Sequence, residues 1–223
     1  MKTKRITIFS GHYGSGKTSL ALNYAFELKS AGYPVLVLDL DIVNPYFRTS
    51  DAAAALADAG IEFISSDFAG SNIDVPSIPP AARRMLDEKD VHAVVDVGGD
   101  DRGALALGRY ASDIRRDGSY DMFLVVNRFR PLTSDGKGAV EVAREIERAS
   151  GLSFTGIINN SNLGAETELE TVLSSRRYAE EISEAMGLPL VRTTVLESAY
   201  PLAKERIEDV YPVKLFPKPE WRV

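Results

Sequence analysis

A run of small residues that ends in a lysine is the first segment that could do chemistry, because residues 10–19 read SGHYGSGKTS. The pattern G-x-x-x-x-G-K-[ST] is matched there by Gly11, Gly16, Lys17 and Thr18. In such a loop the backbone N–H groups turn toward phosphate oxygens, the lysine reaches the β/γ end, and the threonine hydroxyl ligates Mg²⁺. We therefore predict a nucleotide-phosphate site, with Lys17 also catalytic, made of Gly11, His12, Tyr13, Gly14, Ser15, Gly16, Lys17, Thr18 and Ser19.

The segments on both sides of this loop are those that the motif requires. Residues 5–9, RITIF, alternate as a short strand does, and residues 17–32 follow a helical pattern that ends at Gly32. The start of that helix adds the positive end of its dipole to an anion site. A dinucleotide-binding fold also has a glycine-rich turn here, but Ser19 stands where its third glycine would be. The phosphate-loop interpretation is therefore preferred.

Two acidic segments follow apolar strands. In VLVLDLDIVNPYFR, Asp39 and Asp41 leave the strand on the same side, which suits a hard cation held through water, with one carboxylate left to position a nucleophile. A pair of solvated aspartates is the alternative. In AVVDVGGDD, Asp96 ends an apolar strand and is expected on Mg²⁺, with the N–H of Gly99 free to meet a γ-phosphate. We predict Thr18, Asp39 and Asp96 as metal ligands.

Short β-branched runs alternate with helical segments along the whole chain, which is typical of βα units. We predict one domain over residues 1–223 with a three-layer α/β/α P-loop NTPase fold and a mostly parallel sheet of about seven strands. The expected strands are Ile6–Ser10, Val35–Asp39, Ile61–Ser65, Val91–Asp96, Met122–Asn127, Phe154–Asn160 and Leu190–Val195. The expected helices are Lys17–Ala31, Thr49–Ala59, Pro80–Asp87, Gly103–Ile114, Gly136–Ala149, Glu168–Met186 and Ala199–Arg206.

Composition narrows the class of protein. The 26 Lys and Arg residues against 32 Asp and Glu leave a net charge of -6, so no nucleic-acid partner is expected. The absence of cysteine excludes disulfides and thiolate-held metal clusters, and agrees with a reducing cytoplasm. MKTKRITIF leads straight into a short strand, so we expect no secretory leader, and no apolar run reaches the roughly 20 residues that span a bilayer. We expect a soluble, cytoplasmic protein with a surface loop at Ser66–Pro80.

The motifs GHYGSGKTS, DLDIVNP and VVDVGG, in this order, resemble those of the MinD/ParA-type P-loop ATPases, a group that includes the nitrogenase iron protein and the CobQ/CobB-related domains. The resemblance covers nearly the whole chain and implies ATP and Mg²⁺ as cofactors. It also implies a homodimer that closes on ATP and opens on hydrolysis, with Asp41 orienting water and Asp39 near the metal. GIINNSN resembles the iron-protein segment that reads adenine, which implies that Asn160 reads the base and that Leu196 and Glu197 flank it.

The chain departs from this family pattern at His12, where the family usually has a lysine that reaches the partner's phosphates. A neutral imidazole is a poor substitute for that cation, and Arg128 or Arg130 in NRFRP is the alternative, unless both are only surface charges. The C-terminal segment VYPVKLFPKPEWRV has too many prolines for a membrane-binding helix. We expect it to pack along the domain through Phe216 and Trp221, without a membrane anchor.

Three functions remain open on the sequence. The first is an ATPase switch that acts on an unidentified protein partner. The second is a small-molecule kinase or ATP-dependent ligase on the same fold, with the 66–80 loop as acceptor pocket. The third is a nucleotide-binding module with negligible turnover, which His12 suggests.

Overall fold

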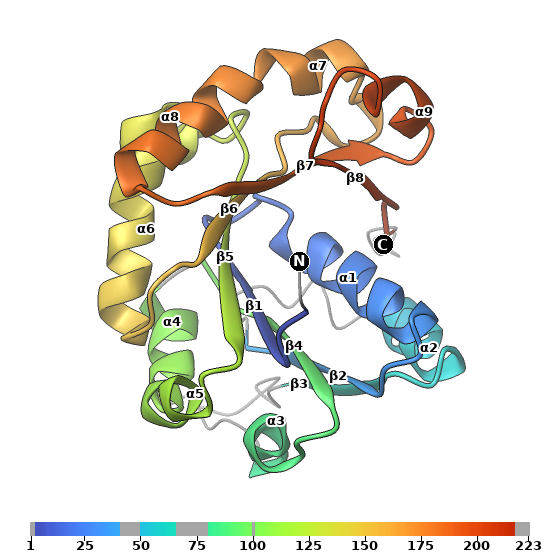
Figure 1. Cartoon of the computed structure of the whole chain (residues 1–223), viewed down its shortest axis with the longest axis vertical. Coiled ribbons are helices and arrows are strands. Elements are labelled where there is room, and N and C mark those ends of the chain that lie inside the picture. Colours follow the sequence, from blue (N-terminus) through green and yellow to red (C-terminus); the bar gives the residue numbers. More distant parts are fainter. Residues whose placement is uncertain (1–2, 41–49, 66–79, 100, 217–223) are drawn as a thin grey trace, which may run out of the picture.

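Eight short apolar segments form one β-sheet in the computed structural model, which describes residues 3–40, 50–65, 80–99 and 101–216 (Figure 1). The strand order is β3-β2-β4-β1-β5-β6-β7-β8, and all neighbouring pairs are parallel. The strands are β1 (Ile6–Ser10), β2 (Val35–Asp39), β3 (Glu62–Ser65), β4 (His92–Asp96), β5 (Tyr120–Val126), β6 (Gly156–Asn159), β7 (Leu190–Leu196) and β8 (Val210–Val213).

Helices cover both faces of the sheet, which gives the predicted three layers (Figure 1). The α-helices are α1 (Lys17–Ser30), α2 (Ser50–Asp58), α3 (Arg84–Asp87), α4 (Asp101–Gly108), α5 (Ala111–Asp117), α6 (Gly136–Ser150), α7 (Leu169–Ser174), α8 (Arg176–Met186) and α9 (Tyr200–Ala203). Among the described residues, 3₁₀ turns lie at η2 (Pro80–Arg83), η3 (Pro131–Thr133) and η4 (Gly164–Glu166). None of the helices in the described ranges is long and apolar enough to cross a membrane.

Alternate residues of the central strands pack into two separate hydrophobic clusters, one on each face of the sheet, as the side-chain alternation of a strand requires. On one face, residues such as Phe9, Val37 and Val94 pack against the apolar sides of α1 and α2. On the other face, Ile8 and Leu38 pack against α3, α4, α5, α6 and α8. The central strands are buried on both faces, which explains why their sequences read as continuous apolar runs.

The eighth strand, VYPV, was not among the predicted strands. β8 lies at the sheet edge beside β7, with Pro212 opposite Val195, and an edge strand tolerates a residue that cannot donate a hydrogen bond outward. The expectation that the C-terminal segment packs along the domain is confirmed as far as Phe216, whose ring stacks on Phe26 of α1 with centroids 5.8 Å apart. Trp221 lies outside the described residues.

Several predicted helices are shorter or broken. The helix expected over Glu168–Met186 divides at Ser175, a buried residue whose hydroxyl donates to the Val172 carbonyl and accepts from Asn159 Nδ2. The helix expected over Gly103–Ile114 divides into α4 and α5, and the one expected over Ala199–Arg206 is only the four residues of α9. The start of the predicted Thr49–Ala59 helix and most of the Ser66–Pro80 loop lie outside the described residues.

Candidate nucleotide-binding site

The loop from β1 into α1 has the backbone of an anion-binding turn. β1 ends at Ser10 between β4 and β5, and α1 begins at Lys17. Gly14 and Gly16 have φ angles of 77° and 85°, in the left-handed region that a glycine adopts at little cost. Gly16 is therefore where the chain changes direction into α1, so the first N–H groups of the helix face the loop. The structure supports the loop geometry that the motif predicts.

The side chain of Asn160 supports this loop through a hydrogen bond to its backbone. It follows β6, is only 6% exposed, and donates from Nδ2 to the Ser15 carbonyl oxygen at 2.7 Å. Its Oδ1 accepts from Thr194 Oγ1 on β7 at 2.5 Å. Because the peptide is trans, holding the Ser15 carbonyl directs the N–H of Gly16 away from Asn160. Both ends of this amide are thus engaged with the protein, and its predicted contact with adenine stays a prediction.

The interior of the loop is polar and closely packed. Lys17 is 3% exposed and Ser15 is 1% exposed. Among the described residues the Ser15 hydroxyl oxygen has no hydrogen-bond partner, and such a buried hydroxyl costs free energy unless something bonds to it. A buried ammonium, an unsatisfied hydroxyl and a helix N-terminus together fit an anion with several acceptor oxygens. The residues present therefore fit a nucleotide phosphate.

Two predicted metal ligands are brought together on neighbouring strands. Asp39 ends β2 and Asp96 ends β4, and the two are register partners, with Phe9 of β1 beside Asp96. Val37 and Val94, two residues earlier on each strand, both face α1, so Asp39 and Asp96 point to the same face as Thr18 at its first turn. Mg²⁺ commonly binds to one or two carboxylates, a hydroxyl, water and phosphate oxygens. The donor set therefore fits Mg²⁺, although within the described ranges no cage of three His, Cys, Asp or Glu forms.

Gly99 touches the phosphate loop directly. A β-carbon built on Gly99 would lie 2.2 Å from the Gly11 carbonyl oxygen and 2.8 Å from the Tyr13 nitrogen, both backbone atoms that cannot simply rotate away. Only glycine can occupy this position without moving the loop. The segment after β4 is thus in contact with the loop that would hold the phosphates, and the contact of the Gly99 N–H with a γ-phosphate stays a prediction. Asp41 lies outside the described residues.

His12 and Tyr13 lie on the outer side of the loop. The Nδ1 atom of His12 is 2.9 Å from the Tyr13 carbonyl oxygen, and because a carbonyl only accepts, Nδ1 carries the proton in this contact. Tyr13 is 56% exposed. The Tyr13 side chain is therefore exposed to solvent, whereas His12 is half-buried.

Two of the predicted nucleotide-binding residues, Ser19 of the loop and Glu197 after β7, both contact Lys214 in the C-terminal segment. Ser19 Oγ donates to the Lys214 carbonyl at 3.4 Å, and Asn23 exchanges two hydrogen bonds with the Lys214 backbone. The exposed Glu197 forms an ion pair with Lys214, 3.6 Å apart, directly after Leu196 ends β7. The sequence does not predict these contacts, because nothing local links residue 214 to α1. The pairing of β8 with β7 creates that proximity.

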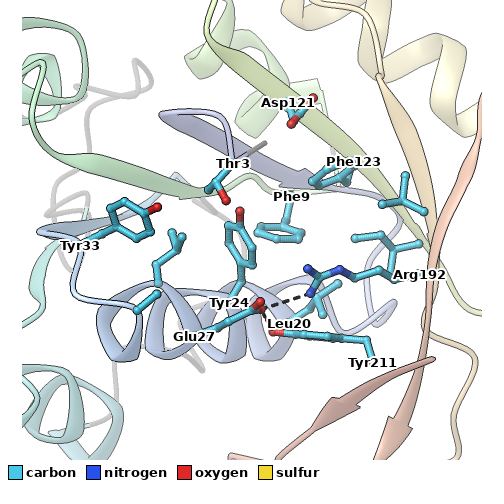
Figure 2. Close-up of a pocket in the computed structure, with 14 residues that line it drawn as sticks. Thr3, Phe9, Leu20, Tyr24, Glu27, Tyr33, Asp121, Phe123, Arg192 and Tyr211 are labelled. Atoms are coloured by element: carbon cyan, nitrogen blue, oxygen red, sulfur yellow. Dashed lines mark hydrogen bonds and ion pairs between the residues drawn. The ribbon is translucent and has the colours of Figure 1, made fainter. Parts of the chain in front are cut away.

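The described residues also form a cavity of about 190 Å³ that is separate from this site (Figure 2). It lies between α1 and the sheet and contains none of the predicted site residues. Its main charges pair internally, since Glu27 accepts from Arg192 at 3.2 Å and from the Tyr211 hydroxyl at 2.6 Å. Burial, assisted by the Glu27 carboxylate, raises the pKa of Tyr211. Burial likewise raises the pKa of Asp121 at the cavity's upper edge in Figure 2.

A parallel α/β sheet with a glycine-rich loop between its central strand and the following helix defines a P-loop nucleotide-binding protein. The model of the CobQ/CobB/MinD/ParA nucleotide-binding domain matches residues 6–171. The chain therefore belongs to the CobQ/CobB/MinD/ParA family, as its motifs indicated. A search of the curated proteins finds no match.

Solved structures with the same fold include signal recognition particle receptors. FtsY from Mycoplasma mycoides is 17% identical with a TM-score of 0.54, over 88% of this chain and 62% of that one. FtsY from Elizabethkingia anophelis in complex with GDP is 17% identical with a TM-score of 0.51, over 87% and 58%. Chloroplast FtsY from Physcomitrella patens is 16% identical with a TM-score of 0.54, over 86% and 59%. This chain thus spans less than two thirds of these proteins, and the likeness shows the fold.

Proposed function

We propose that the protein is a Mg²⁺-dependent ATPase of MinD/ParA type that works as a nucleotide-dependent switch on a protein partner. The observation that carries this proposal is the convergence of three elements at one end of the sheet. They are the buried Lys17 at the start of α1, the register pair Asp39 and Asp96, and the close contact of Gly99 with the loop. In phosphoryl transfer, Lys17 would supply positive charge, the two aspartates would bind the metal, and Gly99 would contact the terminal phosphate.

The chain's own groups have distinct roles in this proposal. Lys17 binds the β- and γ-phosphate oxygens, and the loop N–H groups orient them. Thr18, Asp39 and Asp96 would hold Mg²⁺, which neutralises the charge that develops on the phosphates. Asp41 orients the attacking water, as the family resemblance implies.

The choice of ATP over GTP rests on the family resemblance and not on Asn160, because both ends of the Asn160 amide are already bonded, to Ser15 and to Thr194. Leu196 and Glu197, at the end of β7, would flank the base from the side of α1 and Lys214. One solved structure with this fold is a complex with GDP, so the comparison of ATP with GTP is part of the test.

The switch itself would act through Gly99 and the dimer. Because the Gly99 backbone is already in contact with Gly11 and Tyr13, a γ-phosphate that meets its N–H changes this packing, and hydrolysis reverses the change. In the ATP-bound state, the end of the sheet that carries the nucleotide site would face a second copy of the chain.

Calorimetry with ATP and GTP tests binding. We expect Lys17→Ala to lose at least about tenfold in affinity, because hydrogen bonds to ions contribute about 1.5–3 kcal/mol each. Lys29→Ala is the matched control, since Lys29 lies in the last turn of the same helix and donates to the Gly60 carbonyl. Wild-type affinity in Lys17→Ala would show that the loop does not bind phosphate.

Size-exclusion chromatography with light scattering, with and without Mg²⁺ and a slowly hydrolysed ATP analogue, tests the switch. A dimer that forms only with the analogue supports the proposal, together with basal phosphate release in the absence of any acceptor. Nucleotide turnover that begins only when a metabolite is added would instead identify a kinase or ligase.

A further inference from the structure

Arg130 comes from a loop that is held rigidly beside the phosphate loop. It lies four residues after β5, in the turn between Asn127 and the 3₁₀ turn η3. The buried Asn127 fixes this turn, because its Oδ1 accepts from Phe129 N at 3.0 Å and its carbonyl accepts from Arg130 N at 3.2 Å. Thr133 Oγ1 donates to the same carbonyl. The backbone of Arg130 is therefore well supported.

The Arg130 side chain reaches the phosphate loop itself. Its Nε donates to the Gly14 carbonyl oxygen at 2.7 Å, across 116 residues of sequence. A β-carbon on Gly14 would lie 3.1 Å from Nε and 3.4 Å from Cζ, so the guanidinium packs directly over this glycine. Because Gly14 has no side chain, it leaves room for the Arg130 guanidinium.

The contact with Gly14 uses only part of the guanidinium. An arginine guanidinium carries five N–H donors in a planar fork. Of the three guanidinium nitrogens of Arg130, only Nε has a hydrogen-bond partner among the described residues. The four N–H bonds on its two Nη atoms remain at the rim of a loop that fits phosphate. The neighbouring Arg128 differs, because its Nη1 donates to the Ser174 carbonyl at 2.7 Å, at the end of α7.

We propose that Arg130 is a phosphate-binding residue of the nucleotide site, which supplies from within the chain a positive charge to the terminal phosphates of a nucleoside triphosphate. This rests on the proposed function and adds a residue to it. The free Nη donors give charge-assisted, bidentate hydrogen bonds to phosphate oxygens, while Nε holds the guanidinium in place on Gly14. His12 stands where the family pattern has a lysine. The positive side chains at the site would then be Lys17 from the phosphate loop and Arg130 from the segment after β5.

Three substitutions at position 130 separate charge from support. Arg130→Ala removes both, Arg130→Gln keeps a hydrogen-bond donor without charge, and Arg130→Lys keeps the charge without the fork. The measurement is calorimetric affinity for ADP and for a slowly hydrolysed ATP analogue, with the thermal midpoint of the nucleotide-free protein as a check on folding. Arg128→Ala is the matched control from the same loop.

We expect Arg130→Ala and Arg130→Gln to lose roughly 10- to 100-fold in affinity for the ATP analogue, the range for hydrogen bonds to a charged group, and less for ADP. Arg130→Lys should recover part of the loss, and Arg128→Ala should bind as the wild type does. Unchanged analogue affinity in the alanine and glutamine variants would overturn the inference, as would equal losses for ADP and the analogue. Because Lys17→Ala is measured in the same assay, a loss there with no loss at Arg130 removes this inference alone.

Discussion

The side-chain amide of Asn160 and the carbonyl of Ser15 are joined by a 2.7 Å hydrogen bond that spans 145 residues of sequence and ties the end of β6 to the phosphate loop. A β-carbon on Gly16 would lie 2.3 Å from the same nitrogen, so the amide also packs against the last residue before α1. The side chain is buried, and Thr194 holds its other end. This is the position of a structural support for the loop.

Asn160→Ala should therefore weaken binding of ATP and GTP alike, by roughly 3- to 30-fold, because the free loop must be ordered before it binds phosphate. A residue that reads adenine would instead lower the affinity for ATP and leave GTP unchanged. Calorimetry with both nucleotides distinguishes the two roles. Thr194→Val is a graded control, because it removes the hydroxyl that holds Asn160 Oδ1 and leaves the contact with Ser15; we expect a smaller loss of the same kind.

The phosphate loop, β1 and β2 could be predicted because their signals are local. β1 and β2 are uninterrupted apolar runs, and the loop motif is contiguous from Gly11 to Thr18. The break at Ser175 could not be predicted, because a hydrogen bond from Asn159 on a neighbouring strand supports it. β8 was not predicted, and its Pro212 is compatible with a strand because β8 lies at the edge of the sheet.

In the candidate site, too, features with a local sequence signal could be predicted, and features that depend on contacts distant in sequence could not. The sequence predicted that Asp39 and Asp96 end strands, and the strand order then placed them side by side. It named Arg128 and Arg130 together, and nothing in NRFRP separates them. The direction in which the chain leaves β5 decides that Arg130 meets Gly14 and that Arg128 meets Ser174.

Gly99→Ala should impair the site through the backbone. The added carbon would lie 2.2 Å from the Gly11 carbonyl oxygen, so the phosphate loop or the segment after β4 must move. We expect a loss of stability of about 1–3 kcal/mol, the usual range for overpacking, and a marked loss of nucleotide affinity. Gly136→Ala is the control, because its β-carbon would make only an ordinary contact, 3.6 Å from Glu181 Cβ, at the start of α6. If denaturant unfolding and calorimetry found Gly99→Ala equal to the control, the close contact would not matter.

Asp96→Asn should weaken binding only when Mg²⁺ is present. The amide keeps the shape of the side chain but loses the charge that would hold the cation. We expect the gain in affinity that Mg²⁺ gives the wild type to fall about tenfold or more, which corresponds to about 1.4 kcal/mol. Asp121→Asn on β5, at the separate cavity, is the control.

Asp41→Asn should instead keep the Mg²⁺-dependent affinity and lower turnover, since its carboxylate is expected to orient water. Titrations in Mg²⁺ and in EDTA, together with phosphate release, compare the two variants. Equal losses of affinity for Asp96→Asn and Asp41→Asn would mean that their roles are assigned wrongly.

Asp117 should contribute stability that depends on pH. Its side chain is 8% exposed and accepts from Arg5 at 2.7 Å and from Lys89. Burial alone would raise the pKa of Asp117, but hydrogen bonds from Lys89 and Arg5 outweigh burial and lower it. A lowered pKa in the folded state means that the contribution is complete above the ordinary aspartate pKa of about 3.9 and is lost as the pH falls through the folded value.

Asp117→Asn should therefore lower the thermal midpoint at pH 7, and its difference from the wild type should shrink in acid below about pH 4. Asp113→Asn on the same helix is the control, because its partners Arg116 and Arg83 are 78% and 59% exposed and such exposed pairs contribute little. A difference that stays constant down to about pH 2 would show that the Asp117 carboxylate is not the titrating group.

His12 occupies the position where the family pattern has a lysine that crosses the dimer, and its Nδ1–H is engaged with the Tyr13 carbonyl. A trans-acting cation raises phosphoryl-transfer rates by about 10³–10⁵ in related systems, so a protein without it should hydrolyse ATP slowly. Arg130 does not alter this expectation, because it is argued to bind the phosphates in the ground state.

His12→Ala should leave basal turnover nearly unchanged. His12→Lys should raise turnover in a way that depends on protein concentration, since the new lysine acts only across a dimer. Steady-state phosphate release over a range of protein concentrations checks both variants. A large drop in His12→Ala would mean that the imidazole itself takes part in catalysis, and an increase in His12→Lys that is independent of concentration would place the added charge in its own subunit's site.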